Sequence, residues 1–355
     1  MSHELRLGTR GSPLALWQAH TVAARIAATG GPPCRITIIK TSGDRLQDAP
    51  LSTVGGKRLF VKEIEDALLR RDVDLAVHSS KDMPAVLPAG LVIAGVLPRE
   101  DPLDAVLLPV RLKADTTGPG STTGPGSVVS GFSRTMTIDD LIAHLGPSPA
   151  IGTGSVRRIA QLLRVFPAAR FVPIRGNLDT RLRKLDAGDD VKTDKLDAIV
   201  LAAAGLRRLG FASRISMTLP ADACVPAPGQ GIVAIEIRED DDVTRRAVGA
   251  IDDPQAGAAL AAERALVEAL GGGCQTPVGA LASPLPGDTL ELVAVVVALD
   301  GSRGIRAQAR GSWKDARDLG ARAGAELLSK GAGEILVEAQ RASPTTDSRL
   351  PTTDY

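Results

Sequence analysis

The sequence predicts an α/β protein with a smaller α+β unit at its C-terminal end, and three observations support this class. The 355 residues are too many for one small core and enough for two or three domains. Apolar strand-like runs alternate with helical segments in the first hundred residues and again from 150 to 202, as in largely parallel sheets. From Pro254 onward, an alanine-rich segment followed by two neighbouring strand-like runs replaces this alternation.

The first alternating run is expected to form a sheet whose strands lead into helices. Ser12 and Pro13 occupy the positions of an N-cap and of a first helical residue, which predicts a helix start directly after the first strand. We expect strands at 5–8, 35–40, 75–78 and 91–97, and helices at 13–28 and 62–69.

A second alternating run and a different C-terminal segment follow. In the second run we expect strands near 150, at 170–174 and at 197–202, and helices at 156–165 and 178–186. The turn-rich segment 224–231 then leads into a strand at 232–237. The C-terminal segment is expected to contain a helix at 255–270, strands at 289–299 and 304–310, and a helix at 314–329. Glu263 and Glu268 are expected on a solvated face of the first of these helices.

Three segments do not fit the alternation. Within 113–133, the hexapeptide Thr-Thr-Gly-Pro-Gly-Ser occurs twice in tandem, at 116–121 and 122–127. Such a composition cannot bury a core, so we expect a flexible insertion. Residues 191–195 have the composition of a short polar insertion, and the polar tail 343–355 is expected to be disordered.

Composition and charge exclude several classes of protein. Lysine and arginine number 42 against 41 acidic residues, and aromatic residues make up 2%, which disfavours a nucleic-acid-binding surface. No apolar run reaches the roughly 18 residues of a transmembrane helix, and no signal peptide is visible. The three cysteines show neither a disulfide framework nor zinc-ligand spacing. We therefore expect a cytoplasmic protein with no membrane, nucleic-acid or metal partner.

Three loops combine arginine with the start of a helix. Each follows an expected strand, and their sequences are Gly-Thr-Arg-Gly-Ser-Pro at 8–13, Gly-Thr-Gly-Ser-Val-Arg-Arg at 152–158 and Arg-Gly-Asn at 175–177. A helix N-terminus presents free N–H groups and a partial positive charge, and arginine adds a fork of donors. Because ligands of open α/β sheets bind at the carboxyl ends of the strands, the loops predict a ligand with several negative groups. Codon bias is the other explanation for the high arginine content.

The segment Ala-Val-His-Ser-Ser-Lys-Asp-Met-Pro at 76–84 places charged residues at the end of another expected strand. Asp82 can act as a general acid or base or stabilise a cation, and Lys81 can hold an anion. An ordinary turn before proline explains the same residues without chemistry. His78 is more typical of a structural histidine than of a catalytic base.

Cys274 follows three glycines after the long alanine-rich helix. Glycines allow a sharp turn that leaves a thiol accessible, and a thiolate is a strong nucleophile, so covalent attachment is one interpretation. A small residue in a tight turn is the other. Cys34 and Cys224 have no comparable setting.

From residue 5 to about 339, the chain resembles the hydroxymethylbilane synthases, which are also called porphobilinogen deaminases. The resemblance rests on motifs at 9–19, 54–63, 76–84, 152–158, 175–182, 204–210, 226–231 and 272–279, among them Pro-Ala-Pro-Gly-Gln-Gly and Gly-Gly-Cys-Gln-Thr-Pro-Val-Gly. So many motifs in the same order are not expected by chance.

This resemblance implies an activity and a cofactor. The family joins four porphobilinogen molecules head to tail into the linear tetrapyrrole hydroxymethylbilane and releases ammonia. It extends the product on a dipyrromethane cofactor, which is built from two porphobilinogens and held by a thioether to cysteine. The matching motifs make Cys274 that cysteine, with one cofactor per chain. They make Asp82 the catalytic carboxylate, with Lys81 beside it.

The resemblance also implies which residues hold the acidic side chains of the cofactor and the substrate. These are Arg10, Ser12, Lys57, Lys81, Thr153, Ser155, Arg157, Arg158, Arg175, Gly176 and Arg181, and Arg208 is a further candidate. Each pyrrole carries two carboxylates, so a bound dipyrromethane brings four negative charges. A ligand of this kind fits the three arginine loops.

The family fold has three domains, of which the first two resemble type II periplasmic binding proteins and the third is a small α+β domain. We place domain 1, with the catalytic aspartate, at 1–100 with 230–250. Domain 2 is placed at 104–225, and domain 3, with the cofactor cysteine, at 254–340. The crossings near 98–103 and 226–231 would form a hinge.

We expect a monomer that acts on porphobilinogen. The alternative function is a non-catalytic polycarboxylate-binding module of the periplasmic-binding-protein type. It explains the arginine loops but not the presence of Asp82 together with Cys274.

Overall fold

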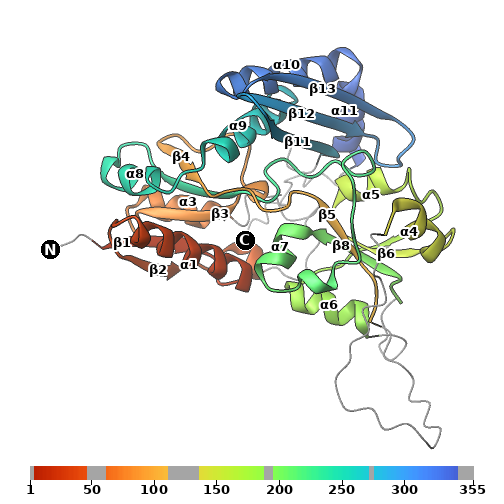
Figure 1. Ribbon diagram of the computed structural model, residues 1–355, viewed down its shortest axis with the longest axis horizontal. Coiled ribbons are helices and arrows are strands. Elements are labelled where there is room, and N and C mark those ends of the chain that lie inside the picture. Colours follow the sequence, from red (N-terminus) through yellow and green to blue (C-terminus); the bar gives the residue numbers. More distant parts are fainter. Residues whose placement is uncertain (1–3, 46–60, 111–135, 188–194, 272–275, 343–355) are drawn as a thin grey trace, which may run out of the picture.

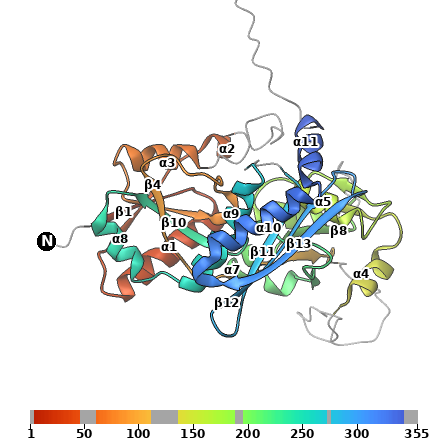
Figure 2. The same cartoon turned by 90° about the horizontal axis from the view of Figure 1, so that it is seen from above.

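The computed structural model describes residues 4–45, 61–110, 136–187, 195–271 and 276–342. In this part of the chain there are two five-stranded sheets and one three-stranded sheet. Figure 1 shows the two larger sheets side by side, with the C-terminal sheet and its helices above them. Seen from above, the C-terminal elements lie across the junction between the two larger sheets (Figure 2). The predicted α/β class with a smaller α+β unit is confirmed.

The first sheet has the strand order β2-β1-β3-β10-β4. Its strands are β1 (Leu5–Thr9), β2 (Cys34–Ile38), β3 (Leu75–Ser79), β4 (Leu91–Val96) and β10 (Val233–Arg238). β1 pairs in parallel with β2 and β3, whereas β10 is antiparallel to β3 and β4. The helices of this part are α1 (Pro13–Ala28), α2 (Ser42–Arg45), α3 (Lys62–Leu69) and α8 (Asp242–Gly249).

The second sheet has the corresponding order, β7-β6-β8-β5-β9. Its strands are β5 (Asp104–Leu107), β6 (Ala150–Gly152), β7 (Arg170–Val172), β8 (Ala198–Ala202) and β9 (Met217–Thr218). β6 pairs in parallel with β7 and β8, and β5 is antiparallel to β8 and β9. The helices of this part are α4 (Ile138–Leu145), α5 (Val156–Leu162), α6 (Leu178–Asp186) and α7 (Ala203–Arg208).

The chain crosses between the two sheets twice, and each crossing delivers an antiparallel strand. β5 follows β4 along the chain but lies in the second sheet, and β10 follows β9 but lies in the first. The crossings are hydrogen-bonded to each other, because Glu100 N donates to Gly231 O at 3.1 Å. Gly231 has φ +88°, and a Cβ atom there would lie 2.2 Å from Glu100 O, so this close approach requires glycine.

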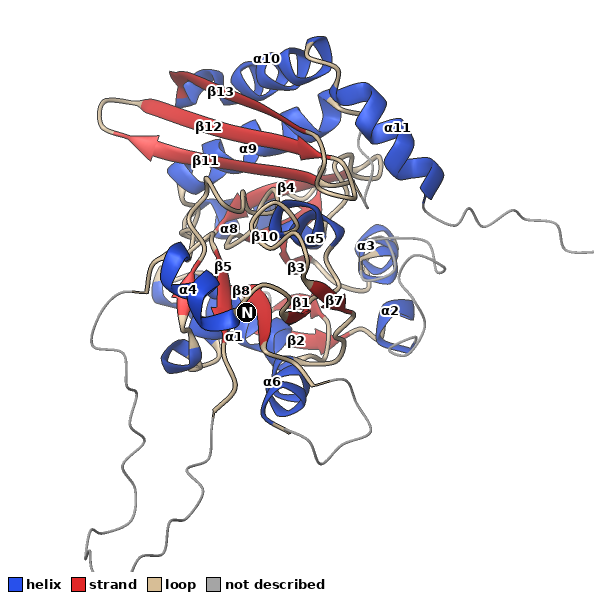
Figure 3. Ribbon diagram, turned by 90° about the vertical axis from the view of Figure 1, so that its right-hand side faces the viewer, coloured by secondary structure: helices blue, strands red, loops and turns tan. Residues whose placement is uncertain are grey.

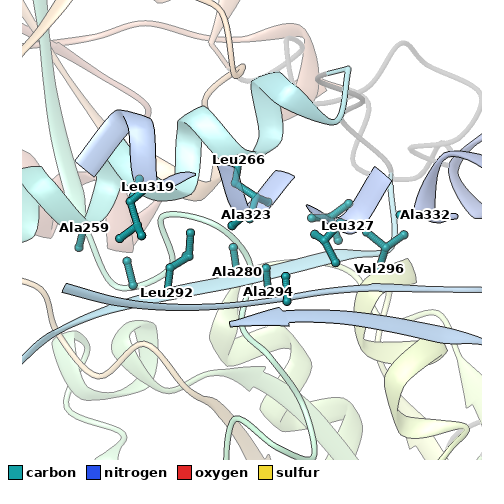
Figure 4. Close-up of a cluster of buried hydrophobic side chains, with 14 of the residues drawn as sticks. Ala259, Leu266, Ala280, Leu292, Ala294, Val296, Leu319, Ala323, Leu327 and Ala332 are labelled. Atoms are coloured by element: carbon teal, nitrogen blue, oxygen red, sulfur yellow. The ribbon is translucent and has the colours of Figure 1, made fainter. Parts of the chain in front are cut away.

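The C-terminal unit is a meander of three antiparallel strands covered by helices on one face (Figure 3). Its strands are β11 (Val278–Leu285), β12 (Thr289–Val297) and β13 (Gly304–Ser312), and its helices are α9 (Pro254–Ala269), α10 (Ala316–Ser329) and α11 (Ala332–Ala342). Figure 4 shows how Leu292, Ala294 and Val296 of β12 face Leu319 and Leu327 of α10. Alternate residues of a strand point to opposite faces, which explains this spacing.

The opposite face of this sheet contacts the second large sheet through α5. Val295 and Val297 of β12 lie in one buried cluster with Ala160 of α5 and with Val225, which precedes the second crossing. At the other end of the unit, Leu260 of α9 is buried against elements of the first sheet. The C-terminal unit therefore packs on both larger sheets.

The longer predicted elements are present with small shifts of their ends, and helices 13–28, 62–69 and 178–186 have the predicted bounds. The predictions missed β5, β9, β11, α2, α4, α7, α8 and α11. β5 and β9 are too short for a periodic signal, and glycine and proline interrupt the apolar pattern of β11. The expected insertion 113–133, the tail 343–355 and most of 191–195 lie outside the described residues. Among the described helices, none is both long and apolar enough to cross a membrane.

Candidate active site

Asp82 lies directly after β3, in a short 3₁₀ turn formed by Ser80–Asp82. Ser80 N donates to Ile232 O at 3.0 Å, and Met83 N donates to Ser80 O at 3.1 Å, which closes the turn. Met83 is buried in one cluster with Leu260 of α9. The turn is thus held by the second crossing and by the C-terminal unit. Asp82 itself stays partly exposed, so a ligand can reach its carboxylate.

Lys81 connects this turn to the second crossing. Its Nζ donates to Gln230 Oε1 at 3.5 Å. Burial lowers the pKa of Lys81 to about 8, and charged groups from both large sheets act on it, namely Asp82, Arg158, Asp104 and Arg157. Desolvation disfavours the charged form of a lysine, which explains the direction of the shift.

Arg157 and Arg158 lie in the first turn of α5, and both are buried. Arg157 Nη1 donates to Asp104 Oδ2 at 2.8 Å and to Val225 O at 2.6 Å. Arg158 donates from Nε and Nη2 to Asp104 Oδ1 at 2.9 and 2.7 Å, and from Nη1 to Val200 O at 2.9 Å. The two arginines are thus held by one carboxylate that the sequence analysis did not identify. Their predicted binding to ligand carboxylates stays a prediction.

The cluster of Asp104, Arg157 and Arg158 carries an excess of positive charge. Burial opposes ionisation of Asp104, but the two guanidinium groups outweigh it and hold the pKa of this carboxyl well below its usual range. Two cations and one anion leave one net positive charge. In addition, Arg157 Nε is a buried N–H group without a hydrogen-bond partner in the described part of the chain. An unbalanced charge and an unused donor suit an anionic ligand.

The third loop places two more cations nearby. Gly176 has φ +104°, and a Cβ atom there would lie 2.8 Å from Thr180 Cγ2, so the loop requires glycine. Gly176 O accepts from Arg181 Nε at 2.9 Å. Burial lowers the pKa of Arg181, and the charges of Arg158 and Arg175 lower it further, whereas that of Asp82 raises it.

The hydroxyl groups named by the sequence analysis shape the loops. Ser12 Oγ accepts from Ala15 N at 3.3 Å and Ser155 Oγ from Arg158 N at 3.5 Å, so both serines are N-caps, as predicted for Ser12. Thr153 is buried, and its Oγ1 accepts from Ser155 N at 3.3 Å. These bonds fix the positions of the backbone N–H groups at the helix starts.

Several predicted residues lie at two sheet edges, one in each of the large sheets. β1 and β3 are parallel neighbours, so Arg10 and Asp82 follow strands that end at the same edge of the first sheet. β6 and β7 are likewise parallel, so the loops at 153–158 and 175–177 lie at one edge of the second sheet. The charge of Asp82 acts on Arg181, which indicates that the two edges lie near each other.

Some predicted residues lie elsewhere or cannot be placed. Lys57 and Cys274 fall outside the described residues. Arg208 contacts the second crossing, where its Nη2 donates to Gly231 O at 2.6 Å. His78 is buried with its Nε2 3.1 Å from Glu236 Oε2, which agrees with a structural histidine. Burial raises the pKa of the Cys224 thiol to about 12, which makes it a poor nucleophile.

The prediction of a solvated face at Glu263 is wrong. Glu263 of α9 is fully buried and accepts from Arg99 Nη1 at 2.6 Å, from Gly229 N at 2.5 Å and from Ala282 N at 2.7 Å. A buried carboxylate requires such partners, and both crossings supply them. The signal that could have found it is the alanine-rich sequence around it, since alanines on every side of a helix indicate close packing.

The donors present fit a ligand with several carboxylates, such as dipyrromethane. Five cations, Lys81, Arg157, Arg158, Arg175 and Arg181, share the site with two carboxylates, Asp82 and Asp104. Five cations and two carboxylates leave three net positive charges, and together with the unused Arg157 donor they favour a polyanion such as this group, which carries four negative charges. Within the described ranges, no group of three or more His, Cys, Asp or Glu residues is arranged to hold a metal ion.

Comparison with known proteins gives a consistent result. Residues 5–246 match the model of the porphobilinogen deaminase dipyrromethane cofactor binding domain, and residues 258–329 match that of the porphobilinogen deaminase C-terminal domain. The porphobilinogen deaminase of Syntrophobacter fumaroxidans is 42% identical over 95% of this chain and 98% of its own. That of Geobacter sulfurreducens is 39% identical over 98% of this chain and 99% of its own.

Among solved structures, a Candida albicans protein described as having the generic periplasmic binding protein fold has a TM-score of 0.37 at 11% identity, covering 97% of this chain and 92% of its own. The family models and the full-length relatives decide the assignment. The chain belongs to the porphobilinogen deaminase family, the hydroxymethylbilane synthases of tetrapyrrole biosynthesis, which are transferases that condense four porphobilinogen molecules with release of ammonia.

Proposed function

We propose that Asp82 is the catalytic carboxylate of this hydroxymethylbilane synthase and that Cys274 carries its dipyrromethane cofactor. The observation that supports the role of Asp82 is its position. It is partly exposed at the end of β3, and its charge acts on Lys81 beside it and on Arg181 of the second sheet. A carboxylate among cations that bind acidic side chains can meet the reacting carbon of a substrate whose carboxylates those cations hold.

Asp82 acts on the charge that develops during the reaction. When ammonia leaves the aminomethyl group of porphobilinogen, positive charge develops on the methylene carbon and the pyrrole ring. A fixed carboxylate stabilises that charge and accepts a hydrogen bond from the pyrrole N–H. It also accepts the proton that is released when the new carbon–carbon bond has formed. One carboxylate can therefore serve every condensation.

The cations hold and orient the acidic groups. Lys81, Arg157, Arg158, Arg175 and Arg181 bind acetate and propionate side chains, with Arg10 and Lys57 as further binders. Ser12, Thr153, Ser155 and Gly176 present the loop backbone to the same groups. Dipyrromethane, when bound, supplies the free pyrrole position on which the product grows.

The attachment at Cys274 is tested by intact-protein mass spectrometry of purified protein. We expect the wild type, Cys34→Ser and Cys224→Ser to carry the mass of two pyrrole units, and Cys274→Ser to lack it. The two control variants are matched because Cys224 is buried with a raised pKa and Cys34 is half-buried with its pKa also raised by burial. An adduct that persists in Cys274→Ser would remove this residue from the proposal.

We further propose that the chain works as a cytoplasmic monomer without a nucleic-acid partner. The balance of 42 basic and 41 acidic residues supports the absence of a nucleic-acid partner. The proposed domains are 1–100 with 230–250, 104–225 and 254–340, joined by the two crossings as a hinge.

The monomer is tested by light scattering after gel filtration, which should give the monomer mass of 36.8 kDa. A dimer mass would contradict the proposed monomer.

A further inference from the structure

We propose that Asp104 and Gln230 are positioning residues that hold Lys81, Arg157 and Arg158 in one arrangement where the two large sheets meet. The proposal rests on the proposed function, because it assigns to those three cations the task of binding acidic groups. Neither Asp104 nor Gln230 needs to touch the substrate for this role.

Asp104 is the centre of the arrangement. It is the first residue of β5 and is fully buried. Its Oδ2 accepts from Arg157 Nη1 at 2.8 Å, and its Oδ1 accepts from Arg158 Nη2 at 2.7 Å. Two guanidinium groups repel each other, and the shared carboxylate offsets that repulsion. Asp104 therefore determines where two adjacent arginines stand and leaves one positive charge for a ligand.

Gln230 extends this arrangement to the first sheet. Its Nε2 donates to Asp104 Oδ1 at 2.9 Å and to Pro102 O at 2.8 Å, and its Oε1 accepts from Lys81 Nζ at 3.5 Å. Gln230 is itself buried, so these bonds face little competition from water. The Gln230 side chain therefore links Asp104, which holds the two arginines, to Lys81.

The two residues also connect the two crossings of the chain. Asp104 directly follows the first crossing, and Gln230 lies in the second, between Gly229 and Gly231. Arg99 of the first crossing donates from Nε to Gln230 O at 2.9 Å, which fixes the backbone at that point. The Gln230 bonds therefore join both crossings to the cations.

The charges that act on Lys81 give this role a specific signature. They come from its own turn (Asp82), from β5 (Asp104) and from α5 (Arg157 and Arg158), and the carboxylates favour the ammonium form whereas the arginines oppose it. Loss of the Asp104 charge therefore lowers the pKa of Lys81, and loss of Arg158 raises it. Turnover that requires protonated Lys81 falls on the alkaline side of the pH profile. The pH of this fall should decrease when the Lys81 pKa is lowered and increase when it is raised.

The test is the pH dependence of kcat/KM for hydroxymethylbilane formation by the full chain with its cofactor. For Asp104→Asn we expect a fall of roughly 10²-fold, as for a displaced catalytic group, and an alkaline limb at lower pH than in the wild type. Arg158→Gln should move the limb to higher pH. Asp101→Asn is the matched control, because Asp101 lies in the same crossing, pairs with Arg207, and as asparagine still accepts from Leu103 N.

A second pair of variants keeps the test decisive if Asp104→Asn does not fold. Gln230→Met retains the length of the side chain but removes the bond to Lys81, so its limb should also lie at lower pH. Asp104→Glu retains the charge and should recover part of the activity and the limb of the wild type.

A merely structural role would lower stability without changing the pH at which kcat/KM falls on the alkaline side. If Asp104→Asn and Gln230→Met lose activity at the same alkaline pH as the wild type, the proposal is overturned. Failure of the wild type to form hydroxymethylbilane would instead overturn the proposed function.

Discussion

The guanidinium carbon of Arg208 lies 5.5 Å from the centre of the Trp17 ring, so a cation of α7 stacks on an aromatic ring of α1. The same arginine donates from Nη2 to Gly231 O at 2.6 Å in the second crossing. One side chain thus connects the helices that flank the two large sheets with the segment that joins them. We therefore expect Arg208 to stabilise the packing of the two large sheets against each other.

Removal of this contact should lower stability. For Arg208→Ala we expect the free energy of unfolding to fall by about 1–2 kcal/mol, since a partly buried cation–π pair and a hydrogen bond are lost together. Urea unfolding followed by tryptophan fluorescence measures the change. Arg207→Ala is the control, because Arg207 is exposed and pairs with Asp101 at the surface, where such pairs contribute about 0–1 kcal/mol. Equal losses in the two variants would contradict the role given to Arg208.

Gly231→Ala should be among the most destabilising substitutions of a glycine in this chain. The position has φ +88°, and the added Cβ would lie 2.2 Å from Glu100 O. The backbone conformation alone costs roughly 1–3 kcal/mol, and the clash forces the two crossings apart. Gly249→Ala in α8 is the control, because no atom lies within 4 Å of the added Cβ, and it should be neutral or stabilising. Thermal unfolding of both variants decides the matter, and a Gly231→Ala protein as stable as Gly249→Ala would show that the crossings can move apart freely.

The pH dependence of activity and of stability should differ at Lys81. Its pKa is lowered to about 8 by burial, so turnover that needs the ammonium form falls as the pH rises through that value. Between about 8 and the usual lysine pKa of 10.5, the unfolded chain binds more protons at this group than the folded chain does. The contribution of Lys81 to the free energy of unfolding therefore rises with pH over the same window. In Lys81→Arg, the loss of activity with rising pH should occur at a higher pH than in the wild type, because arginine stays charged. A loss at the same pH as in the wild type would show that Lys81 does not cause it.

Local chemistry made part of this site predictable. Ser12 before Pro13 marks the start of α1 because an N-cap and a first-turn proline act within one helical turn. Lys81 and Asp82 were identified because they follow directly on an apolar strand. Helix α6 was predicted with its observed bounds, since its apolar positions repeat with the period of a helix.

Contacts between distant residues were beyond such reasoning. Asp104 and Arg157 are 53 residues apart, and the strand order of the second sheet, with β8 between β5 and β6, brings them together. The burial of Glu263 depends on Arg99, which is 164 residues away. A charged residue in sequence has no intrinsic sign of burial, because its partners are supplied by the fold.

The central claim is that Asp82 performs the chemistry, and the variant Asp82→Asn tests it most directly. Asparagine keeps the size and one acceptor oxygen but loses the charge and the ability to take a proton. Asp82→Glu is the matched variant, because it keeps the charge but displaces it, and it should retain more activity than asparagine.

The measurement is single-turnover release of ammonia from porphobilinogen by purified Asp82→Asn protein loaded with cofactor. Loss of electrostatic stabilisation and of proton transfer should slow the release by at least about 10²-fold, while substrate binding persists. A rate within about tenfold of the wild type would contradict the account and remove Asp82 from the mechanism.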